Sequence, residues 1–175
     1  PTTAGECFTF TMLAFNFAEQ FRTPVFILSS KEIGMTKERI DWAKLKKPEI
    51  INRKYHKEGK FIPYKFDQSD DIPDFLPYGS NEVVRYTTST HDECGLLLSD
   101  PEKIQKMMDH LNDKITYEKI SLVEKDFQEE AETLIISYGV TDRSAKAAIQ
   151  KARKLGHKVS SQEIYSYWPL QEKQI

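Results

Sequence analysis

The sequence has 175 residues, 39% hydrophobic and 11% aromatic, which is enough apolar material for one medium domain or two small ones. The formal net charge of −2 gives no global attraction for nucleic acid or for an anionic membrane. No apolar run reaches the ~18 residues of a membrane span and no signal peptide is visible, so we expect a cytoplasmic protein without nucleic-acid or membrane partners.

Charge is distributed unevenly along the chain. Residues 31–65 carry eleven basic and five acidic residues, whereas residues 66–132 carry six basic and seventeen acidic ones. Two solvated surfaces would explain this pattern, and so would docking surfaces for partner subunits, because complementary charge steers assembly.

Residues 1–30 contain a helix followed by a strand. Phe10, Leu13, Phe17 and Phe21 recur at helical spacing, which predicts a helix over Gly5–Arg22, and its further apolar residues predict burial on more than one side. The helix should end at Thr23-Pro24, because proline cannot donate a backbone hydrogen bond. The short apolar run from Val25 to Leu28 then predicts a strand that is buried on both faces of a parallel sheet.

The middle of the chain is less regular. Residues 31–82 are rich in proline and charge and show little periodicity, which indicates an extended linker between two units. Residues 83–132 begin with a β-type run over Val83–Thr88 and a polar loop over Thr90–Gly95. A capping box from Ser99 to Glu102 then starts an amphipathic helix with one apolar face on a core.

Residues 133–175 predict a strand, a helix and a second strand. The first strand covers Thr133–Ser137, and the helix runs from a cap at Thr141 or Asp142 to Leu155, with Gly156 as its left-handed end. Strand segments at 158–160 and 163–165 follow, and a parallel right-handed crossover is the expected connection. The fold class is therefore α/β, with a partial parallel-sheet unit, a long linker and the start of a second parallel α/β domain.

Few residues suggest chemistry. Cys7 and Cys94 show no spacing typical of zinc or iron–sulfur ligands, so we expect no metal site in this chain. The cluster from Thr90 to Glu93 could support acid–base work or metal ligation, but adjacent side chains rarely converge, which favours a structural turn. The Tyr138–Thr141 turn could bind an anion at a helix start, yet it lacks the glycines of the phosphate-binding fingerprints.

Three segments in collinear order resemble the α subunits of 2-oxoacid:ferredoxin oxidoreductases. Gly5–Glu19 and Thr23–Ser29 resemble the end of the family's pyrimidine-type domain, with its AFNLAE helix and TPVIVLSD strand. Thr88–Gly95 resembles the family's G-x-E-H-D-E-Y-G loop. Residues 134–156 with the Trp168-Pro169-Leu170 ending resemble the start of a transketolase C-terminal-like domain.

The chain departs from that pattern at two of the matched positions. Ser30 stands where the family has aspartate, and Cys94 stands where it has tyrosine. On this resemblance the domain limits are 1–30 for the end of the pyrimidine-type domain and 31–82 for the linker. A connecting segment over 83–132 and the start of the transketolase C-terminal-like domain over 133–175 complete the division.

The resemblance implies a function for the complete complex in anaerobic metabolism. A 2-oxoacid would be oxidatively decarboxylated to an acyl-CoA, with electrons passing to ferredoxin. Pyruvate, 2-oxoglutarate, branched-chain and aryl oxoacids are all open as substrates, and the separate α-type subunit favours 2-oxoglutarate or a branched-chain acid. Thiamine diphosphate, magnesium and an iron–sulfur cluster would belong to that complex, with a β subunit and further γ and δ subunits as partners. None of these cofactors is expected within this chain alone.

The resemblance also limits what can be assigned to individual residues. It places the catalytic residues upstream of Pro1, so no catalytic, cofactor-binding, substrate-binding or metal-binding residue is assigned here. His91, Asp92 and Glu93 are candidates for contact with a neighbouring subunit or domain. A non-catalytic α/β interaction module or assembly subunit of the same fold is the alternative, and a stand-alone nucleotide-binding protein is a third interpretation.

Overall fold

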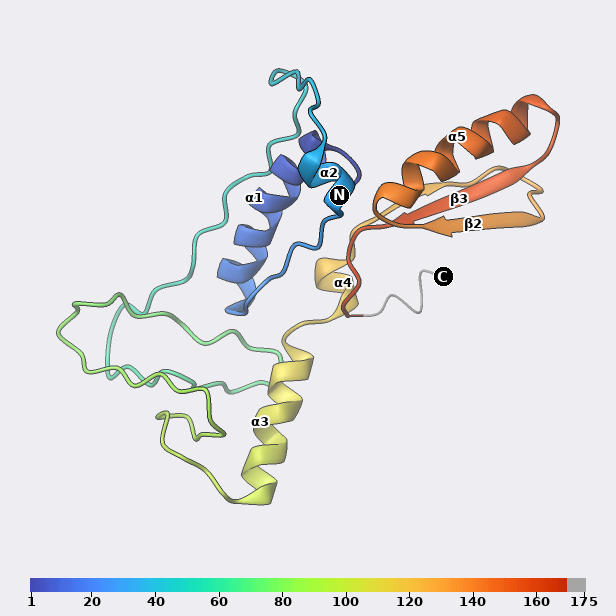
Figure 1. Cartoon of the computed structure of the whole chain (residues 1–175). Helices are drawn as coiled ribbons and strands as arrows, with labels where there is room; N and C mark the ends of the chain where they lie inside the picture. Colours follow the sequence, from blue (N-terminus) through green and yellow to red (C-terminus); the bar gives the residue numbers. More distant parts are fainter. Residues whose placement is uncertain (170–175) are drawn as a thin grey trace. The chain divides into compact units, whose positions relative to one another are not determined.

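The computed structural model describes residues 1–169, with the side chain of Tyr117 excepted, and the chain divides into two compact units (Figure 1). The first unit holds Pro1–Ala14, Phe26–Glu49 and the chain from Tyr117 onward. The second holds Phe15–Val25 and Ile50–Thr116. Helix α1 (Ala4–Phe21) contributes a part to each.

Helix α1 forms where its periodicity predicts it and ends before Arg22, which has a φ of 47°. The predicted burial on more than one side is wrong: only Asn16 and Phe21 are buried, and Phe15 is 67% exposed. Coil segments rather than a sheet make the contacts, for example where the Asn16 side chain accepts a hydrogen bond from the backbone N–H of Ile51. Such segments cover less of a helix than a layer of strands does.

The predicted buried strand over Val25–Leu28 is also wrong. These residues are exposed coil, and Phe26 is 82% exposed. A strand exists only where a neighbour pairs with its backbone N–H and C=O groups. Among the described residues, no strand pairs with this run.

Residues 31–100 are mostly irregular. The short helix α2 (Lys31–Met35) begins at Ser30, whose side chain accepts a hydrogen bond from the backbone N–H of Ile33. Beyond α2 the segment has isolated bridges, Tyr55 with Phe75 and His91 with Leu97, rather than strands. The predicted β-type run over Val83–Thr88 is therefore coil, and Val83 is fully exposed.

Helix α3 (Pro101–Asp113) confirms the predicted amphipathic helix but begins differently. Its N-cap is Asp100, whose carboxylate accepts from the backbone N–H groups of Glu102 and Lys103, so the predicted cap at Ser99 lies one residue too early. The short helix α4 (Tyr117–Ile120) follows. Both residues that could cap α3 are short polar side chains, and only the backbone geometry selects Asp100.

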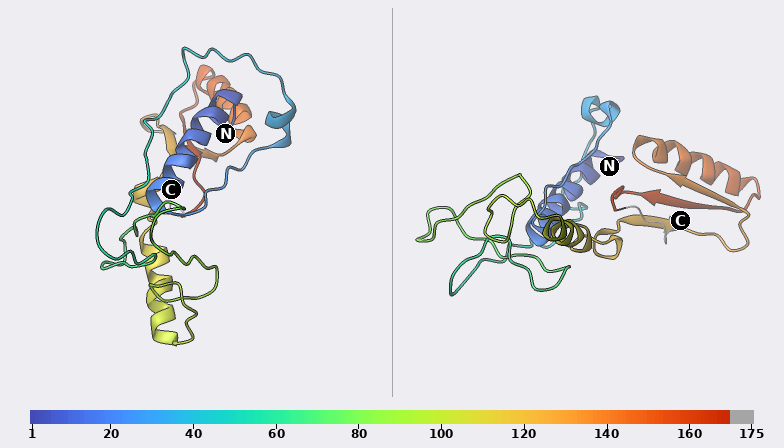
Figure 2. Two further views of the ribbon diagram at one scale, coloured as in Figure 1. Left: turned by 90° about the vertical axis from the view of Figure 1, so that its left-hand side faces the viewer. Right: turned by 90° about the horizontal axis from the view of Figure 1, so that it is seen from below.

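A three-stranded sheet and helix α5 form the end of the first unit. The strands are β1 (Val123–Asp126), β2 (Thr133–Ser137) and β3 (Val159–Ile164), in the spatial order β1-β3-β2, and α5 (Val140–Lys154) connects β2 to β3. Strands β2 and β3 are parallel, which confirms the predicted parallel pairing and the α/β class; the right hand of the crossover stays a prediction. Strand β1, which was not predicted, pairs with β3 in antiparallel orientation. Figure 2 shows α5 along one face of the sheet.

The ends of α5 differ from each other in how well they were predicted. The N-cap is Gly139 rather than Thr141 or Asp142, and it makes no side-chain capping bond. At the other end Gly156 has a φ of 89°, and the backbone N–H of His157 donates to the carbonyl of Ala152 at 3.1 Å, which confirms the left-handed glycine end.

Strand β3 lies in the centre of the sheet and is buried although it is mostly polar. Ser160, Ser161, Gln162 and Glu163 are all buried. On β2, by contrast, Leu134 and Ile136 are exposed, so β2 is not buried on both faces. A cis peptide bond joins Trp168 to Pro169, and Leu170 of the predicted ending lies outside the described residues, as does the end of the 133–175 domain. The four domain limits stay predictions.

Candidate functional site: a basic cavity in the second unit

The polar loop over Thr90–Gly95 folds as a tight turn around Asp92. One carboxylate oxygen of Asp92 accepts hydrogen bonds from the backbone N–H groups of Cys94 and Leu96, both at 2.9 Å. Gly95 has a φ of 81°, and a Cβ added there would lie 2.7 Å from the carbonyl oxygen of Arg85. Glycine is therefore required at this point, and the loop is a structural turn as its composition indicates.

Aromatic and backbone contacts fix the loop against its surroundings. The ring of Tyr64 lies 3.8 Å, centroid to centroid, from the imidazole of His91. The backbone N–H of Tyr64 donates to the carbonyl of Glu93 at 3.0 Å, and the backbone N–H of Leu98 donates to the carbonyl of Thr90 at 3.0 Å. The loop thus holds the His91 ring in a defined position.

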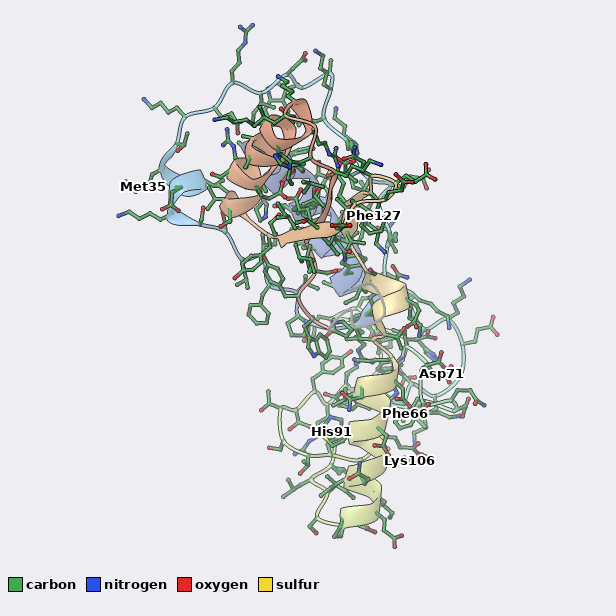
Figure 3. The ribbon with its side chains drawn as sticks, turned by 90° about the vertical axis from the view of Figure 1, so that its right-hand side faces the viewer. Met35, Phe66, Asp71, His91, Lys106 and Phe127 are labelled. Carbon is green, nitrogen blue, oxygen red and sulfur yellow. The ribbon has the colours of Figure 1, made fainter. Side chains whose placement is uncertain are left out.

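A cavity of about 760 Å³ opens beside this loop. Its wall consists of residues 87–93, Leu98, the aromatic side chains of Tyr64 and Phe66, Arg22 from just after α1, and the face of α3 that runs from Lys103 to Lys114. Figure 3 shows the labelled side chains of Phe66, His91 and Lys106 gathered around α3. The volume lies within the range of ligand-binding pockets, roughly 300–1,000 Å³.

The face of α3 that lines the cavity carries a row of basic side chains, which Lys114 continues just after the helix ends. Lys103, Lys106, His110 and Lys114 follow one another at spacings of three and four residues, and we call these four residues the basic ladder. Residues at this spacing lie on one side of a helix. Met107, Met108 and Leu111 lie between them and also line the cavity, so its α3 side is both basic and apolar.

Two of the cations around the cavity are held inside the fold, Lys114 buried and Arg22 half-buried. The Arg22 guanidinium donates to the carbonyls of Pro63 and Asp74, at 2.5 and 3.1 Å, and lies over the rings of Tyr64 and Phe75. The Lys114 ammonium donates to the carbonyl of Arg22 at 3.2 Å. Burial lowers the pKa of both side chains below their ordinary values, and the positive charge of Arg22 lowers that of Lys114 further.

Two imidazoles line the cavity with their tautomers fixed. Nδ1 of His91 lies 2.8 Å from the carbonyl oxygen of Asp92, and Nδ1 of His110 lies 2.9 Å from that of Ser69. A carbonyl only accepts, so in both rings Nδ1 carries the hydrogen and Nε2 of the neutral ring is an acceptor. His110 is also stacked on Phe66 at 3.9 Å, and burial lowers its pKa, which favours the neutral form.

A second polar cluster lies in the first unit, between α5 and the sheet. The Lys146 ammonium lies 2.9 Å from a carboxylate oxygen of Asp142 and 2.5 Å from one of Glu163, and the hydroxyl of Ser137 donates to Asp142 at 2.6 Å. The Tyr165 hydroxyl donates to Glu163 at 2.8 Å. The cluster attaches α5 to β3.

Burial and hydrogen bonding compete in setting the pKa values of this cluster. Burial raises the pKa of Glu163, and its bond to Lys146 offsets this only in part. Burial also acts to raise the pKa of Asp142, but the hydrogen bonds from Ser137 and Lys146 prevail and leave it lowered. For Lys146 the bonds to the two carboxylates outweigh burial, so its pKa is raised.

Comparison with known proteins places the chain in a family. Residues 1–110 match the sequence profile described as pyruvate flavodoxin/ferredoxin oxidoreductase, thiamine diphosphate-binding. The chain belongs to this family. Its resemblance to the α subunits of 2-oxoacid:ferredoxin oxidoreductases is thereby confirmed.

Curated relatives cover the whole chain. A 2-oxoglutarate synthase subunit KorA from Methanothermobacter marburgensis is 38% identical over the full chain, and one from Methanocaldococcus jannaschii is 31% identical over 97% of it. A ketoisovalerate oxidoreductase subunit VorB from Methanothermobacter marburgensis is 24% identical. The chain spans about half the length of the curated relatives it matches, 47%, 46% and 43% in these three.

A solved structure supports the fold. The 2-oxoglutarate:ferredoxin oxidoreductase from Magnetococcus marinus, with 2-oxoglutarate, coenzyme A and succinyl-CoA bound, matches 97% of the chain and 30% of its own chain, with a TM-score of 0.77 and 24% identity. The similarity shows that the two proteins share a fold over the matched region.

The family profile that matches residues 1–110 is described as thiamine diphosphate-binding. Within residues 1–169 no group of three or more His, Cys, Asp or Glu could hold a metal ion. A magnesium ion beside a diphosphate needs only one or two carboxylates, because phosphate oxygens and water complete its coordination. We assign no thiamine diphosphate ligand to individual residues of this chain.

The structure places the three predicted contact residues at one side of the cavity. His91, Asp92 and Glu93 all line it, with Glu93 exposed. Their contact with a neighbouring subunit stays a prediction. The sequence interpretation missed the basic ladder, because it assigned the face of α3 from its apolar residues alone; the spacing of Lys103, Lys106 and His110 was the available signal.

Proposed function

We propose that this chain is part of the α subunit of a 2-oxoglutarate:ferredoxin oxidoreductase. The observation that carries the proposal is the 38% identity, over the whole chain, to a 2-oxoglutarate synthase subunit. The identity to the ketoisovalerate subunit is 24%, so 2-oxoglutarate is favoured over a branched-chain acid.

In the proposed reaction, 2-oxoglutarate and coenzyme A give succinyl-CoA and carbon dioxide, and two electrons pass one at a time to two ferredoxins. Thiamine diphosphate, when bound in the complete complex, stabilises the carbanion that forms on decarboxylation. Magnesium and an iron–sulfur cluster would be held by a β subunit, with further γ and δ subunits as partners. A cytoplasmic location accords with the two free thiols, Cys7 and Cys94.

The chain's own residues would act as a scaffold in this complex. The Asp92 turn and the Tyr64–His91 contact present the His91, Asp92 and Glu93 side chains as one rigid loop, which suits a subunit contact.

The described part of the chain contains no helix long and apolar enough to cross a membrane.

The test uses the natively purified protein that contains this chain, together with its β subunit. Ferredoxin reduction would be followed with coenzyme A and one of three acids: 2-oxoglutarate, pyruvate or 2-oxoisovalerate. We expect kcat/KM for 2-oxoglutarate to exceed the values for pyruvate and for 2-oxoisovalerate at least ~10-fold. This ratio corresponds to about 1.4 kcal/mol of discrimination between the substrates. A preference for 2-oxoisovalerate would refute the substrate, and no turnover with any 2-oxoacid would favour a non-catalytic assembly subunit.

A further inference from the structure

We propose that the cavity of the second unit binds a nucleoside diphosphate, with the phosphates on the lysines of α3 and the base against the aromatic wall. The proposal concerns a site that the oxidoreductase function does not require, and it stands or falls separately from that function. Charge, size, wall chemistry and the two fixed imidazoles support it.

The charge of the cavity favours an anion. The basic ladder and Arg22 face two carboxylates, those of Asp92 and Glu93, and the Asp92 carboxylate already accepts two backbone hydrogen bonds. Lys103 has only a loose ion pair with Asp100, at 3.9 Å and largely exposed, which contributes little to stability. The ammonium groups of Lys103 and Lys106 are therefore the groups best suited to receive phosphate oxygens.

The size of the cavity favours a ligand larger than a short dicarboxylic acid. At 1.5 Å per residue, the ladder from Lys103 to Lys114 extends over roughly 16 Å along the helix. A short dicarboxylate bound in a cavity of about 760 Å³ would contact only a small part of the cavity wall. A nucleotide is long enough to contact the ladder at one end and the aromatic side chains at the other.

The wall also contains the surface that a flat base needs. Phe66 is stacked on His110 with their ring planes 4° apart, and Tyr64 contacts His91 with their ring planes tilted by 35°. Met107 and Leu111 add apolar surface beside them. Aromatic side chains offer a base a face on which to stack.

The imidazoles supply acceptors for ribose hydroxyls or for the amino group of a base. Because Nδ1 donates to a backbone carbonyl in both His91 and His110, Nε2 accepts in the neutral ring. Burial lowers the pKa of His110 and so favours its neutral form, which leaves the lysines as the phosphate-binding cations. The cavity therefore separates cationic phosphate contacts from neutral sugar or base contacts.

Two other occupants make different predictions. Thiamine diphosphate carries the same diphosphate but a cationic ring, which the excess positive charge disfavours. An acidic segment of a partner subunit would satisfy the lysines but would not require the aromatic wall.

The experiment measures ADP binding to the natively purified protein by calorimetry and locates the site by photolabelling with 8-azido-ADP. The variants are Lys106→Gln and the double variant Lys103→Gln/Lys106→Gln, both on an exposed helix surface, and Lys151→Gln on the exposed side of α5 is the matched control. Adenosine, pyrophosphate and thiamine diphosphate serve as partial or competing ligands. Thermal unfolding of each variant verifies that it is folded.

We expect saturable ADP binding that the double variant weakens at least ~10-fold and that Lys151→Gln leaves unchanged. Adenosine, pyrophosphate and thiamine diphosphate should each displace the photolabel less effectively than ADP does, and the photolabel should map to peptides within residues 64–114. The proposal is overturned if ADP does not bind, if the double variant binds as well as the wild type, or if the label maps elsewhere. If ADP does not bind and Lys106 crosslinks to an acidic segment of a partner subunit, the cavity is a protein-contact site and the proposal is overturned.

Discussion

Lys146 allows two carboxylates to remain buried between α5 and the sheet. Its ammonium contacts both Asp142 and Glu163, and the side chains of these two acids are only 2% and 1% exposed. Without that cation the acids would lose a charged partner in a place that water hardly reaches, which costs more than the ion pair itself contributes. The Lys146 side chain is itself 43% exposed, so this cation, unlike the two acids, remains in contact with solvent.

Lys146→Met should lower the free energy of unfolding by about 1–3 kcal/mol, because it leaves two buried acceptors without their cation. Lys151→Met, on the exposed side of the same helix, is the control and should change stability by less than about 0.5 kcal/mol. Urea denaturation would measure both. Equal stabilities of the two variants would show that the cluster contributes nothing, whereas partial recovery in Lys146→Met/Glu163→Leu would locate the cost at Glu163.

The start of α3 shows how a single element depends on its local geometry. Asp100 has an extended backbone, and its carboxylate accepts from two of the first N–H groups of the helix, while Pro101 follows at a position where no N–H is needed. An acidic side chain at this end also interacts favourably with the helix dipole. This cap sets the residue at which α3 begins, and the basic ladder follows from that start.

Asp100→Ala should therefore cost about 1 kcal/mol of stability, as expected for the loss of an N-cap. Ser99→Ala, one residue earlier, should have almost no effect. Thermal unfolding and amide hydrogen exchange in the first turn of α3 would test the pair. If Ser99→Ala proved the more damaging substitution, Ser99 would be the cap.

At the scale of the whole molecule, both units leave apolar side chains exposed. Val25 belongs to the second unit and Phe26 to the first, and both side chains are exposed. Leu134 and Ile136 on β2 of the first unit are exposed as well. Soluble monomers rarely expose large contiguous apolar patches, so such surfaces commonly mark interfaces. This agrees with a chain that spans about half the length of its relatives.

Native mass spectrometry of the natively purified protein should accordingly find a complex far heavier than the 20.4 kDa of this chain. The copurifying subunit should be rich in cysteine and contain thiamine diphosphate and iron. A free monomer of 20.4 kDa, without thiamine diphosphate, would contradict both the assembly and the oxidoreductase proposal.

Local patterns were sufficient for the elements that hold themselves together. The periodicity of α1 and the glycine end at Gly156 follow from short-range rules of helix spacing and turn chemistry. The glycine of the Thr90–Gly95 loop belongs to the same class, because its positive φ is a local requirement. The motifs in these segments also indicated the family.

Tertiary contacts decided what local patterns leave open. Val25–Leu28 has strand-like residues, yet it is exposed coil, because a strand depends on a partner that a short-range pattern cannot supply. β3 has polar residues, yet it is buried, because β1 and β2 pair with it on both sides and Lys146 compensates its glutamate. The cavity likewise required Arg22, Tyr64, the Asp92 turn and α3 to come together, although they are far apart in the sequence.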